Sequence, residues 1–317
     1  MNRPSATDRA SPAAPAAGQA SLPLRPLWQV LRPRQWTKNI VVLAAFFFAL
    51  GDKQQHLSPF MFGWALLGAA IFCLTASAVY IFNDIIDRGR DLLHPGKRLR
   101  PIAAGAIPLP LAWGLALVLL GIGLAGAWFV GAGFVLTLGA YVLLQIAYTF
   151  ALKHVALLDV FVIAAGFVLR AVAGGFAVNV SISPWLLICT FLMALFLALC
   201  KRRHEKQLVT AEQLRELRPS LLASSERLFD QLIAVMAGAV IIAYAIYTQW
   251  PDTVAKFQTT RLSWTIPFVI FGVFRYLDLV YRRAEGDQPE YTLLTDLPLI
   301  LDILLFGACV WLITLTA

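Results

Sequence analysis

Charged residues are scarce in this chain of 317 residues. Asp, Glu, Lys and Arg together make up 14% of the sequence, whereas hydrophobic residues make up 59% and the mean hydropathy is +0.73. Because soluble domains carry about 25% charged residues, this composition excludes an ordinary soluble domain. It predicts a protein embedded in a lipid bilayer, and it gives no reason to expect a nucleic-acid partner.

Cysteine is also rare, and its pattern carries no functional signal. Cys73, Cys189, Cys200 and Cys309 all lie in apolar segments, without CxxC spacing or a paired histidine. The sequence therefore indicates neither a disulfide framework nor a thiolate metal site, and we expect these side chains to pack in the protein interior.

The first 26 residues lack the apolar core that a secretory signal needs. They are rich in Ala, Pro and Ser, which predicts a disordered cytoplasmic tail over residues 1–26. The remainder of the chain, residues 27–317, is predicted to form one transmembrane domain.

Long apolar runs are abundant after this tail. A hydrocarbon core about 30 Å thick needs roughly 20 apolar residues per helix. Nine segments are candidates: 36–51, 60–83, 107–129, 133–152, 158–178, 184–200, 231–250, 262–281 and 297–316. The first is the weakest, because its unbroken apolar part covers only residues 40–50. Gly131-Ala132-Gly133 is the natural turn between the third and fourth. We predict an all-α, polytopic bundle of nine helices with its termini on opposite sides of the membrane.

Basic residues are distributed unevenly between the two sides of the predicted bundle. Most lie in the N-terminal segment and in the connections after spans two, four, six and eight, whereas only Lys53, Lys256 and Arg261 lie on the other side. Because cationic loops stay in the cytoplasm, these connections are predicted to face the cytoplasm from the inner (cytoplasmic) membrane. Residues 204–230 are predicted to form a cytoplasmic loop in this set.

The most informative motif closes the second predicted span and reads Asn83-Asp84-Ile85-Ile86-Asp87-Arg88-Gly89-Arg90-Asp91. On a continuous helix, this spacing places Asp84, Asp87 and Asp91 within about 60° on one face. Carboxylates crowded beside a bilayer repel one another unless a cation lies between them. Asn and Asp oxygens, with waters and phosphates, are the ligands that Mg²⁺ prefers. The run therefore predicts a Mg²⁺ site for a phosphorylated substrate, with a solvated helix end as the simpler alternative.

Basic segments around this run exceed what membrane orientation requires. A donor with a second, remote phosphate would need a separate cationic pocket of this kind. The segments are Arg32 to Asn39, Lys97 to Pro101, Lys153, Arg170 and Lys201 to Arg203. An arginine in the middle of a span is costly and normally faces a polar interior or a partner. Arg170 is therefore either a phosphate ligand or a structural partner of Asp278 or Asp302.

The pattern NDxxDxxxD at the end of the second of nine helices resembles the UbiA superfamily of intramembrane prenyltransferases, over nearly the whole chain after residue 27. The resemblance implies a bundle with a polar cavity facing the cytoplasm, and Mg²⁺ held against a pyrophosphate leaving group. It also implies a second acidic motif after helix four or six. This chain departs from that pattern, because the connection after span four contains Lys153 and His154, and its nearest acid is the single Asp159.

Four segments are similar to one branch of this superfamily, the decaprenyl-phosphate phosphoribosyltransferases: RPRQWTKN, NDxxDxxxD with HPGKRLRP, LKHVALLDVFVIAAGFVLRA and SPWLLICTFLMALFLALCKRR. The resemblance implies transfer of 5-phosphoribose from phosphoribosyl pyrophosphate to a polyprenyl phosphate, with release of pyrophosphate. The alternatives are a prenyltransferase that acts on an aromatic acceptor and an anion or lipid transporter. The single acid after span four disfavours the former, and the lack of a visible inverted repeat disfavours the latter.

The motif and the resemblance together assign roles to individual residues. Metal binding is predicted for Asn83, Asp84 and Asp87, and a catalytic role for Asp84, Asp87 and Asp159, the last near the positive charge that develops at ribose C1. An acceptor phosphate is ionised near neutral pH, so no general base is needed. Substrate binding is predicted for Gln35, Lys38, Asn39, Asp91, Lys97, Arg98, Tyr148, Lys153, Arg170, Lys201 and Arg202. A homo-oligomer is compatible with the sequence.

Overall fold

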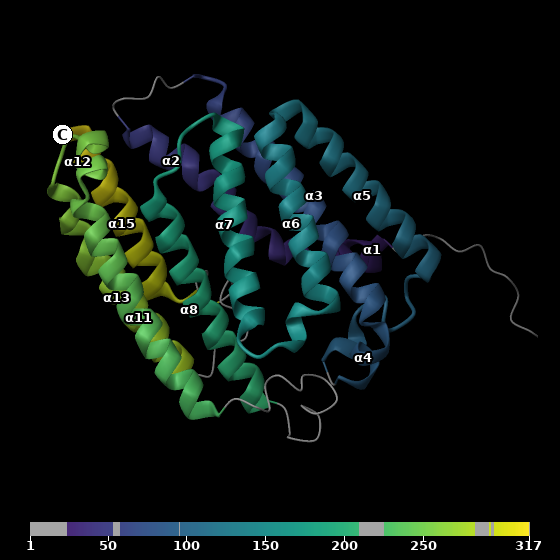
Figure 1. Cartoon of the computed structure of the whole chain (residues 1–317). Helices are drawn as coiled ribbons and strands as arrows, with labels where there is room; N and C mark the ends of the chain where they lie inside the picture. The colour runs from purple at the N-terminus through teal and green to yellow at the C-terminus, as the bar shows by residue number, and fades with distance from the viewer. Residues whose placement is uncertain are drawn as a thin grey trace, which may run out of the picture.

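The computed structural model describes residues 24–52, 58–94, 96–208, 225–282, 292 and 295–316. All regular elements among these residues are helices, as predicted, and they form one bundle (Figure 1). In chain order they are α1 (Leu24–Leu31), η1 (Pro33–Leu43), α2 (Ala44–Gly51), α3 (Met61–Ile86), α4 (Arg88–Leu93), η2 (Lys97–Leu99), α5 (Leu109–Val130), α6 (Ala132–Phe150), η3 (Leu152–His154), α7 (Leu158–Val178), α8 (Pro184–Leu208), α11 (Glu226–Gln249), α12 (Pro251–Phe257), η4 (Arg261–Thr265), α13 (Ile266–Arg282) and α15 (Leu297–Thr316).

Eight helical segments of the described residues are long and apolar enough to cross a membrane. They coincide with the second to ninth predicted spans, and α7 matches the prediction at both ends. α8 continues to Leu208 and α11 begins at Glu226, so both reach further into the polar region between them than predicted. Gly131, with a φ of 137°, forms the predicted turn between α5 and α6.

The prediction of nine regular transmembrane helices is wrong at the first segment. Residues 36–51 lie in η1, a 3-10 helix of 11 residues, and in α2, an α-helix of eight residues. Runs of 3-10 helix longer than three or four residues are uncommon, so neighbouring helices must hold η1 in place. A Cβ atom on Gly174 of α7 would lie 2.1 Å from the Val42 carbonyl oxygen. The lack of a side chain at Gly174 therefore allows η1 to contact the α7 backbone.

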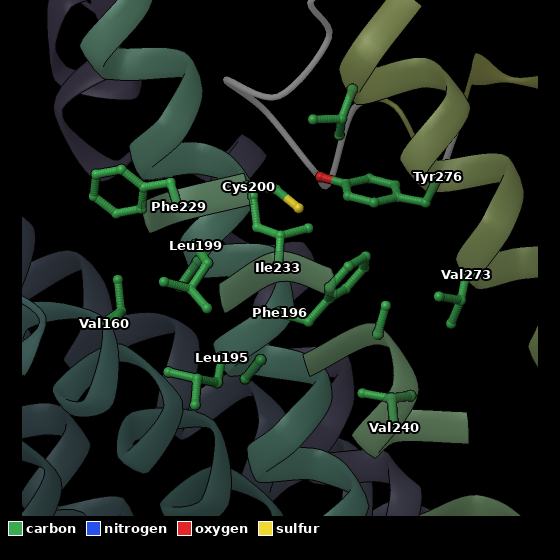
Figure 2. Packing of buried hydrophobic residues seen from close by; sticks show 14 of the residues in the cluster. Val160, Leu195, Phe196, Leu199, Cys200, Phe229, Ile233, Val240, Val273 and Tyr276 are labelled. Carbon is green, nitrogen blue, oxygen red and sulfur yellow. The ribbon is translucent and has the colours of Figure 1, made fainter. Parts of the chain in front are cut away.

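Helix α7 occupies the centre of the bundle, where it packs against η1, α2, α3, α6 and α8. A large apolar cluster joins α7, α8, α11 and α13, and it includes Phe196, Ile233 and Tyr276 (Figure 2). A second cluster joins η1, α3, α6 and α7 around Phe72 and Phe134. Close packing of large side chains at these crossings fixes the helices relative to one another.

The outer faces of the bundle are strongly apolar. Leu117, Trp128 and Phe129 of α5 are exposed, as are Leu304 and Leu312 of α15. Exposed apolar surface of this extent would favour aggregation in water. In a bilayer the same side chains contact lipid chains, which agrees with the predicted membrane location.

Polar elements gather at one end of the bundle. α4, the connection between α6 and α7, and the end of α8 lie at the bottom in Figure 1, whereas the end of α2 and helix α12 lie at the top. The bottom end therefore carries the connections that were predicted to be cytoplasmic. Residues 1–23 of the predicted tail, Lys53 and residues 209–224 of the predicted loop lie outside the described residues, and α1 begins at Leu24.

Candidate functional site

The acidic run does not follow one continuous helix. α3 ends at Ile86, Asp87 has a φ of −86° and a ψ of 2°, and α4 begins at Arg88. The spacing argument assumed one unbroken helix, whereas Asp87 is a turn residue, although its N–H still donates to the Asn83 carbonyl and the Asp91 N–H still donates to the Asp87 carbonyl. Asp84 and Asp91 are nevertheless both buried, with exposed fractions of 2% and 4%.

Two arginines neutralise these buried aspartates. Arg100 Nη1 donates to Asp84 Oδ1 at 3.0 Å and to Asp91 Oδ2 at 2.7 Å. Arg32 Nη2 donates to both carboxylate oxygens of Asp84, at 2.5 and 2.8 Å. Arg32 lies between α1 and η1 with a φ of 53°, a conformation that is uncommon for a residue with a Cβ atom. Because buried charges are stable only when paired, the two arginines offset the cost of burying the carboxylates.

The C-terminal end of α6 and the following η3 contribute two further contacts. Lys153 Nζ donates to both carboxylate oxygens of Asp87, at 2.7 and 2.8 Å. Thr149 Oγ1 donates to Asn83 Oδ1 at 3.2 Å. The predicted substrate ligand Lys153 thus lies against the predicted metal ligand Asp87. We call the eight residues of these contacts the acidic-run cluster: Arg32, Asn83, Asp84, Asp87, Asp91, Arg100, Thr149 and Lys153.

A second cluster forms around Arg202, which is only 3% exposed. Its Nε donates to Asp159 Oδ2 at 2.5 Å, and its Nη1 donates to Glu205 Oε2 at 2.6 Å. Its Nη2 also lies 3.4 Å from the Tyr148 hydroxyl, which accepts a hydrogen bond. One buried guanidinium therefore bridges two carboxylates from α7 and α8. Asp159, Arg202 and Tyr148 were predicted site residues, and the structure brings them together in this Arg202 cluster.

Arg170 and Asn39, both predicted substrate ligands, lie together in the protein interior. Arg170 Nε donates to Asn39 Oδ1 at 2.8 Å, Nη1 donates to the Gly166 carbonyl at 2.9 Å, and Nη2 donates to the Tyr141 hydroxyl at 2.9 Å. The guanidinium carbon also lies 4.7 Å from the centre of the Tyr141 ring. Among the described residues Arg170 has no carboxylate partner, so the expected alternative of a pair with Asp278 or Asp302 is wrong.

The other predicted substrate ligands are less deeply placed. Four of them have half-buried side chains: Gln35, Lys38, Lys97 and Lys201. Arg98 is exposed. Lys97 and Arg98 form η2, between the acidic run and Arg100, and Lys201 precedes Arg202 in α8. These three cations therefore lie next in sequence to the two clusters.

The oxygen atoms of Asn83, Asp84 and Asp87 have the chemistry that a hard divalent cation requires. Among the described residues, however, no three His, Cys, Asp or Glu side chains form a preassembled metal site. Protein cations supply the positive charge instead. Burial raises the pKa of the Asp91 carboxyl, and the charge of Arg100 and its hydrogen bond oppose this rise. The donor set fits Mg²⁺ chemically, with its carboxylates held by cationic side chains.

Four residues of the clusters received no individual site role from the sequence, although the two arginines lie in the predicted cationic segments: Arg32, Arg100, Thr149 and Glu205. Both arginines precede a proline, which restricts the backbone of the residue before it, but Arg25 and Arg218 do as well. That signal is therefore weak. Glu205 and Thr149 carry no sequence signal that we can identify, because only the fold brings them to their partners.

A separate small pocket, with a volume of about 30 Å³, lies near the opposite end of the bundle. Asp52, Tyr247 and Lys256 are among its lining residues. None of the predicted site residues lines this cavity, so it is distinct from both clusters.

The chain resembles proteins of one membrane family along most of its length. Residues 40–290 match the model of the UbiA prenyltransferase family. The decaprenyl-phosphate phosphoribosyltransferase of Mycolicibacterium smegmatis is 34% identical over 295 residues, which cover 91% of this chain and 92% of that protein. The protein of the same name from Mycobacterium tuberculosis is 35% identical over 293 residues, with the same coverage.

The fold also matches a solved structure of the family. A UbiA homolog from Archaeoglobus fulgidus bound to GPP and Mg²⁺ has a TM-score of 0.69, with 19% identity, over 91% of this chain and 99% of that chain. This likeness concerns the fold alone, while the relatives at 34–35% identity extend it to the sequence. Eight helices of the described part are long and apolar enough to cross a membrane, and the chain is an integral membrane protein that belongs to the UbiA prenyltransferase family.

Proposed function

We infer that this protein transfers 5-phosphoribose from phosphoribosyl pyrophosphate to a polyprenyl phosphate and releases pyrophosphate. The observation that carries this inference is the similarity, at 34–35% identity over 91% of the chain, to two decaprenyl-phosphate phosphoribosyltransferases. The protein is then a membrane-bound pentosyltransferase. Its acceptor is a decaprenyl-type lipid phosphate, as in those relatives.

Mg²⁺ is the proposed cofactor, as in the Archaeoglobus fulgidus homolog that was solved with Mg²⁺ and GPP. Asn83, Asp84 and Asp87 would hold the ion through their oxygen atoms. Bound there, Mg²⁺ would neutralise the charge of the departing pyrophosphate. Asp91 contributes through Arg100, to which it is hydrogen-bonded.

The basic residues of the chain are also needed to bind a second group of the donor, because phosphoribosyl pyrophosphate has a 5-phosphate that is distant from its pyrophosphate. Lys97, Arg98 and Lys201 lie at the end of the bundle that carries the two clusters. We assign binding of the donor phosphates to them, since Lys and Arg side chains bind phosphate through charge-assisted hydrogen bonds. We keep Gln35 and Lys38 of η1 as candidate ligands of the same substrates.

Asp159 was predicted to lie near ribose C1. Its Oδ2 accepts a hydrogen bond from Arg202, which Glu205 holds as well. We therefore propose that Asp159 acts chiefly by positioning Arg202 and Tyr148 beside the substrate. The acceptor phosphate, with a second pKa of about 6, is ionised at neutral pH and needs no base from the protein.

The alternative function, transfer of a prenyl chain to an aromatic acceptor, would use two acidic motifs. Asp159 and Glu205 do form a second pair of carboxylates, but Arg202 lies between them and neutralises part of their charge. We therefore favour the phosphoribosyl donor. From the positively charged connections we also propose that this end of the bundle faces the cytoplasm from the inner membrane.

A direct assay tests this function. Purified protein, Mg²⁺, labelled phosphoribosyl pyrophosphate and a polyprenyl phosphate are expected to give a labelled, lipid-soluble product and free pyrophosphate. Geranyl pyrophosphate with an aromatic acid serves as the competing substrate pair. Protein that is folded but transfers label only in the second reaction would overturn the assignment.

A further inference from the structure

We propose that Arg32, Arg100 and Lys153 act as exchangeable counter-ions. In the ligand-free protein they pair with the carboxylates of the acidic run, and they turn to the donor's pyrophosphate when metal and donor bind. This inference rests on the proposed function. It adds Arg32 and Arg100 to the residues that bind the donor, and it gives Lys153 a second binding partner.

The pairing of charges in the acidic-run cluster is complete. Each aspartate has a cationic nitrogen within 3.0 Å: Arg32 and Arg100 serve Asp84, Arg100 serves Asp91, and Lys153 serves Asp87. Three carboxylates therefore face these three cations, and the exposed Arg90 adds a longer ion pair of 3.7 Å to Asp87. A divalent ion bound to the same carboxylates would leave the cluster with excess positive charge, which a multiply charged pyrophosphate would balance.

Arg32 and Arg100, rather than the carboxylates with which they pair, have room to move. The side chains of Arg32 and Arg100 are 23% and 27% exposed, whereas that of Asp84 is 2% exposed. Lys153, at 11%, is less exposed than its partner Asp87, at 16%, but it lies in the short η3 helix. All three side chains are long and come from segments at the ends of helices, so rotation about their side-chain bonds can redirect the charge without moving the main transmembrane helices.

Two other arginines, Arg202 and Arg170, are held in fixed positions by their hydrogen bonds and provide a contrast. Arg202 is 3% exposed and is hydrogen-bonded to Asp159, Glu205 and Tyr148. Arg170 is 4% exposed and donates to three acceptors in the protein interior. Neither can leave its partners without exposing buried polar groups, which is costly. The partly exposed cations of the acidic-run cluster carry a smaller penalty.

Exchange and a purely structural role make opposite predictions for the metal. If a cation competes with the metal for a carboxylate, its removal strengthens binding of the metal alone. If the same cation later binds pyrophosphate, its removal weakens binding of pyrophosphate in the presence of metal. If the ion pair is purely structural, removal of the cation weakens binding of both the metal and pyrophosphate, because the carboxylates lose their correct positions.

The test measures two binding constants for each variant in detergent. The first is for Mn²⁺ alone, followed by the electron paramagnetic resonance signal of the free ion. The second is for inorganic pyrophosphate at saturating Mn²⁺. In Arg100→Gln and Lys153→Gln we expect Mn²⁺ to bind about fivefold tighter, as the loss of a partly exposed ion pair allows. Pyrophosphate is expected to bind at least fivefold weaker.

Arg227→Gln is the matched control, since Arg227 is exposed in the first turn of α11 and forms no ion pair with another described residue. It should leave both constants unchanged. Arg100→Lys and Lys153→Arg retain the charge and should restore both constants if folding of the glutamine variants is impaired. Unchanged or weaker Mn²⁺ binding in folded Arg100→Gln and Lys153→Gln would overturn the exchange. If the wild-type protein forms labelled lipid while these variants lose both ligands, the proposed function stands and this inference fails.

Discussion

Tyr148 and Thr149 are consecutive residues at the end of α6, yet their side chains contact the two different clusters. The Tyr148 hydroxyl accepts a hydrogen bond from Arg202, and the Thr149 hydroxyl donates to Asn83. Successive residues of a helix point about 100° apart, so one helical turn can serve both clusters. The end of α6 therefore fixes the distance between the acidic-run cluster and the Arg202 cluster.

The first prediction concerns the carboxylates that are assigned to the metal. Asp84→Asn and Asp87→Asn keep the side-chain shape but remove the charge, and each should lower turnover by more than about 100-fold. Asp278→Asn is the control, because the ion pairs of Asp278 with other described residues are those with Arg275 and Arg282 in α13. Rates like the wild type in folded Asp84→Asn or Asp87→Asn would refute the metal assignment.

Removal of the metal itself is a second test. Treatment with a chelator should abolish formation of labelled lipid, and added Mg²⁺ should restore it, because the leaving pyrophosphate would otherwise depart with its charge uncompensated. Ca²⁺ at the same concentration is the comparison, since it prefers longer bonds and more ligands. Full activity after exhaustive chelation would exclude a metal-dependent reaction.

Glu205, which the sequence did not single out, provides a third prediction. Glu205→Gln removes one of the two charges that hold Arg202, so we expect turnover to fall by about tenfold, which corresponds to roughly 1.4 kcal/mol. Glu226→Gln, in the exposed first turn of α11, should have no effect. A folded Glu205→Gln protein with normal kinetics would show that Asp159 alone suffices to position Arg202.

Arg170 separates a structural role from substrate binding. Arg170→Met leaves Asn39 and Tyr141 without their shared donor, so the free energy of unfolding should fall by about 1–3 kcal/mol. Because the guanidinium is fully engaged by protein groups, we expect the KM for the donor in the folded variant to stay the same. A lower thermal midpoint with a raised KM would instead support the predicted role of Arg170 as a substrate ligand. Arg261→Met is the control, because Arg261 lies in η4, away from the end of the bundle that carries the two clusters, and it should leave the KM for the donor unchanged.

The contact between η1 and α7 is the subject of a fifth prediction. A methyl group at Gly174 would collide with the Val42 carbonyl oxygen, so Gly174→Ala should destabilise the fold by about 3 kcal/mol, the upper part of the range for overpacking. An added Cβ at Gly139 of α6 meets no atom within 4 Å. Gly139→Ala should therefore leave the thermal midpoint unchanged. Equal midpoints for the two variants would contradict the close approach of η1 to α7.

Most of the helices could be predicted from the sequence, because a span of the right length depends only on a local run of apolar residues. α7 illustrates this at both of its ends. The first segment could not be predicted in the same way, since Thr37, Lys38 and Asn39 interrupt its apolar character. Its 3-10 geometry depends on Gly174 and Arg170, which the chain supplies far downstream.

The candidate site was only partly accessible from the sequence. The acidic run identified Asp84 and Asp87 by their residue types alone. The partners of these residues depend on the fold, since Arg32 lies 52 residues before Asp84, and Lys153 lies 66 residues after Asp87. A break in the helix at Asp87 was not foreseen either, because Ile85 to Asp91 contains no proline and only one glycine.

The irregular first segment also bears on how the protein is assembled during synthesis. With rises of about 2.0 and 1.5 Å per residue, η1 and α2 extend over about 34 Å, slightly more than the hydrocarbon thickness of a bilayer. Lys38 and Asn39 make this segment a poor substrate for independent insertion by the translocation machinery. The arginine that binds Asn39 leaves the ribosome 131 residues later. We therefore expect the first segment to reach its final position after α7 has been inserted, so that the order of assembly differs from the order of translation.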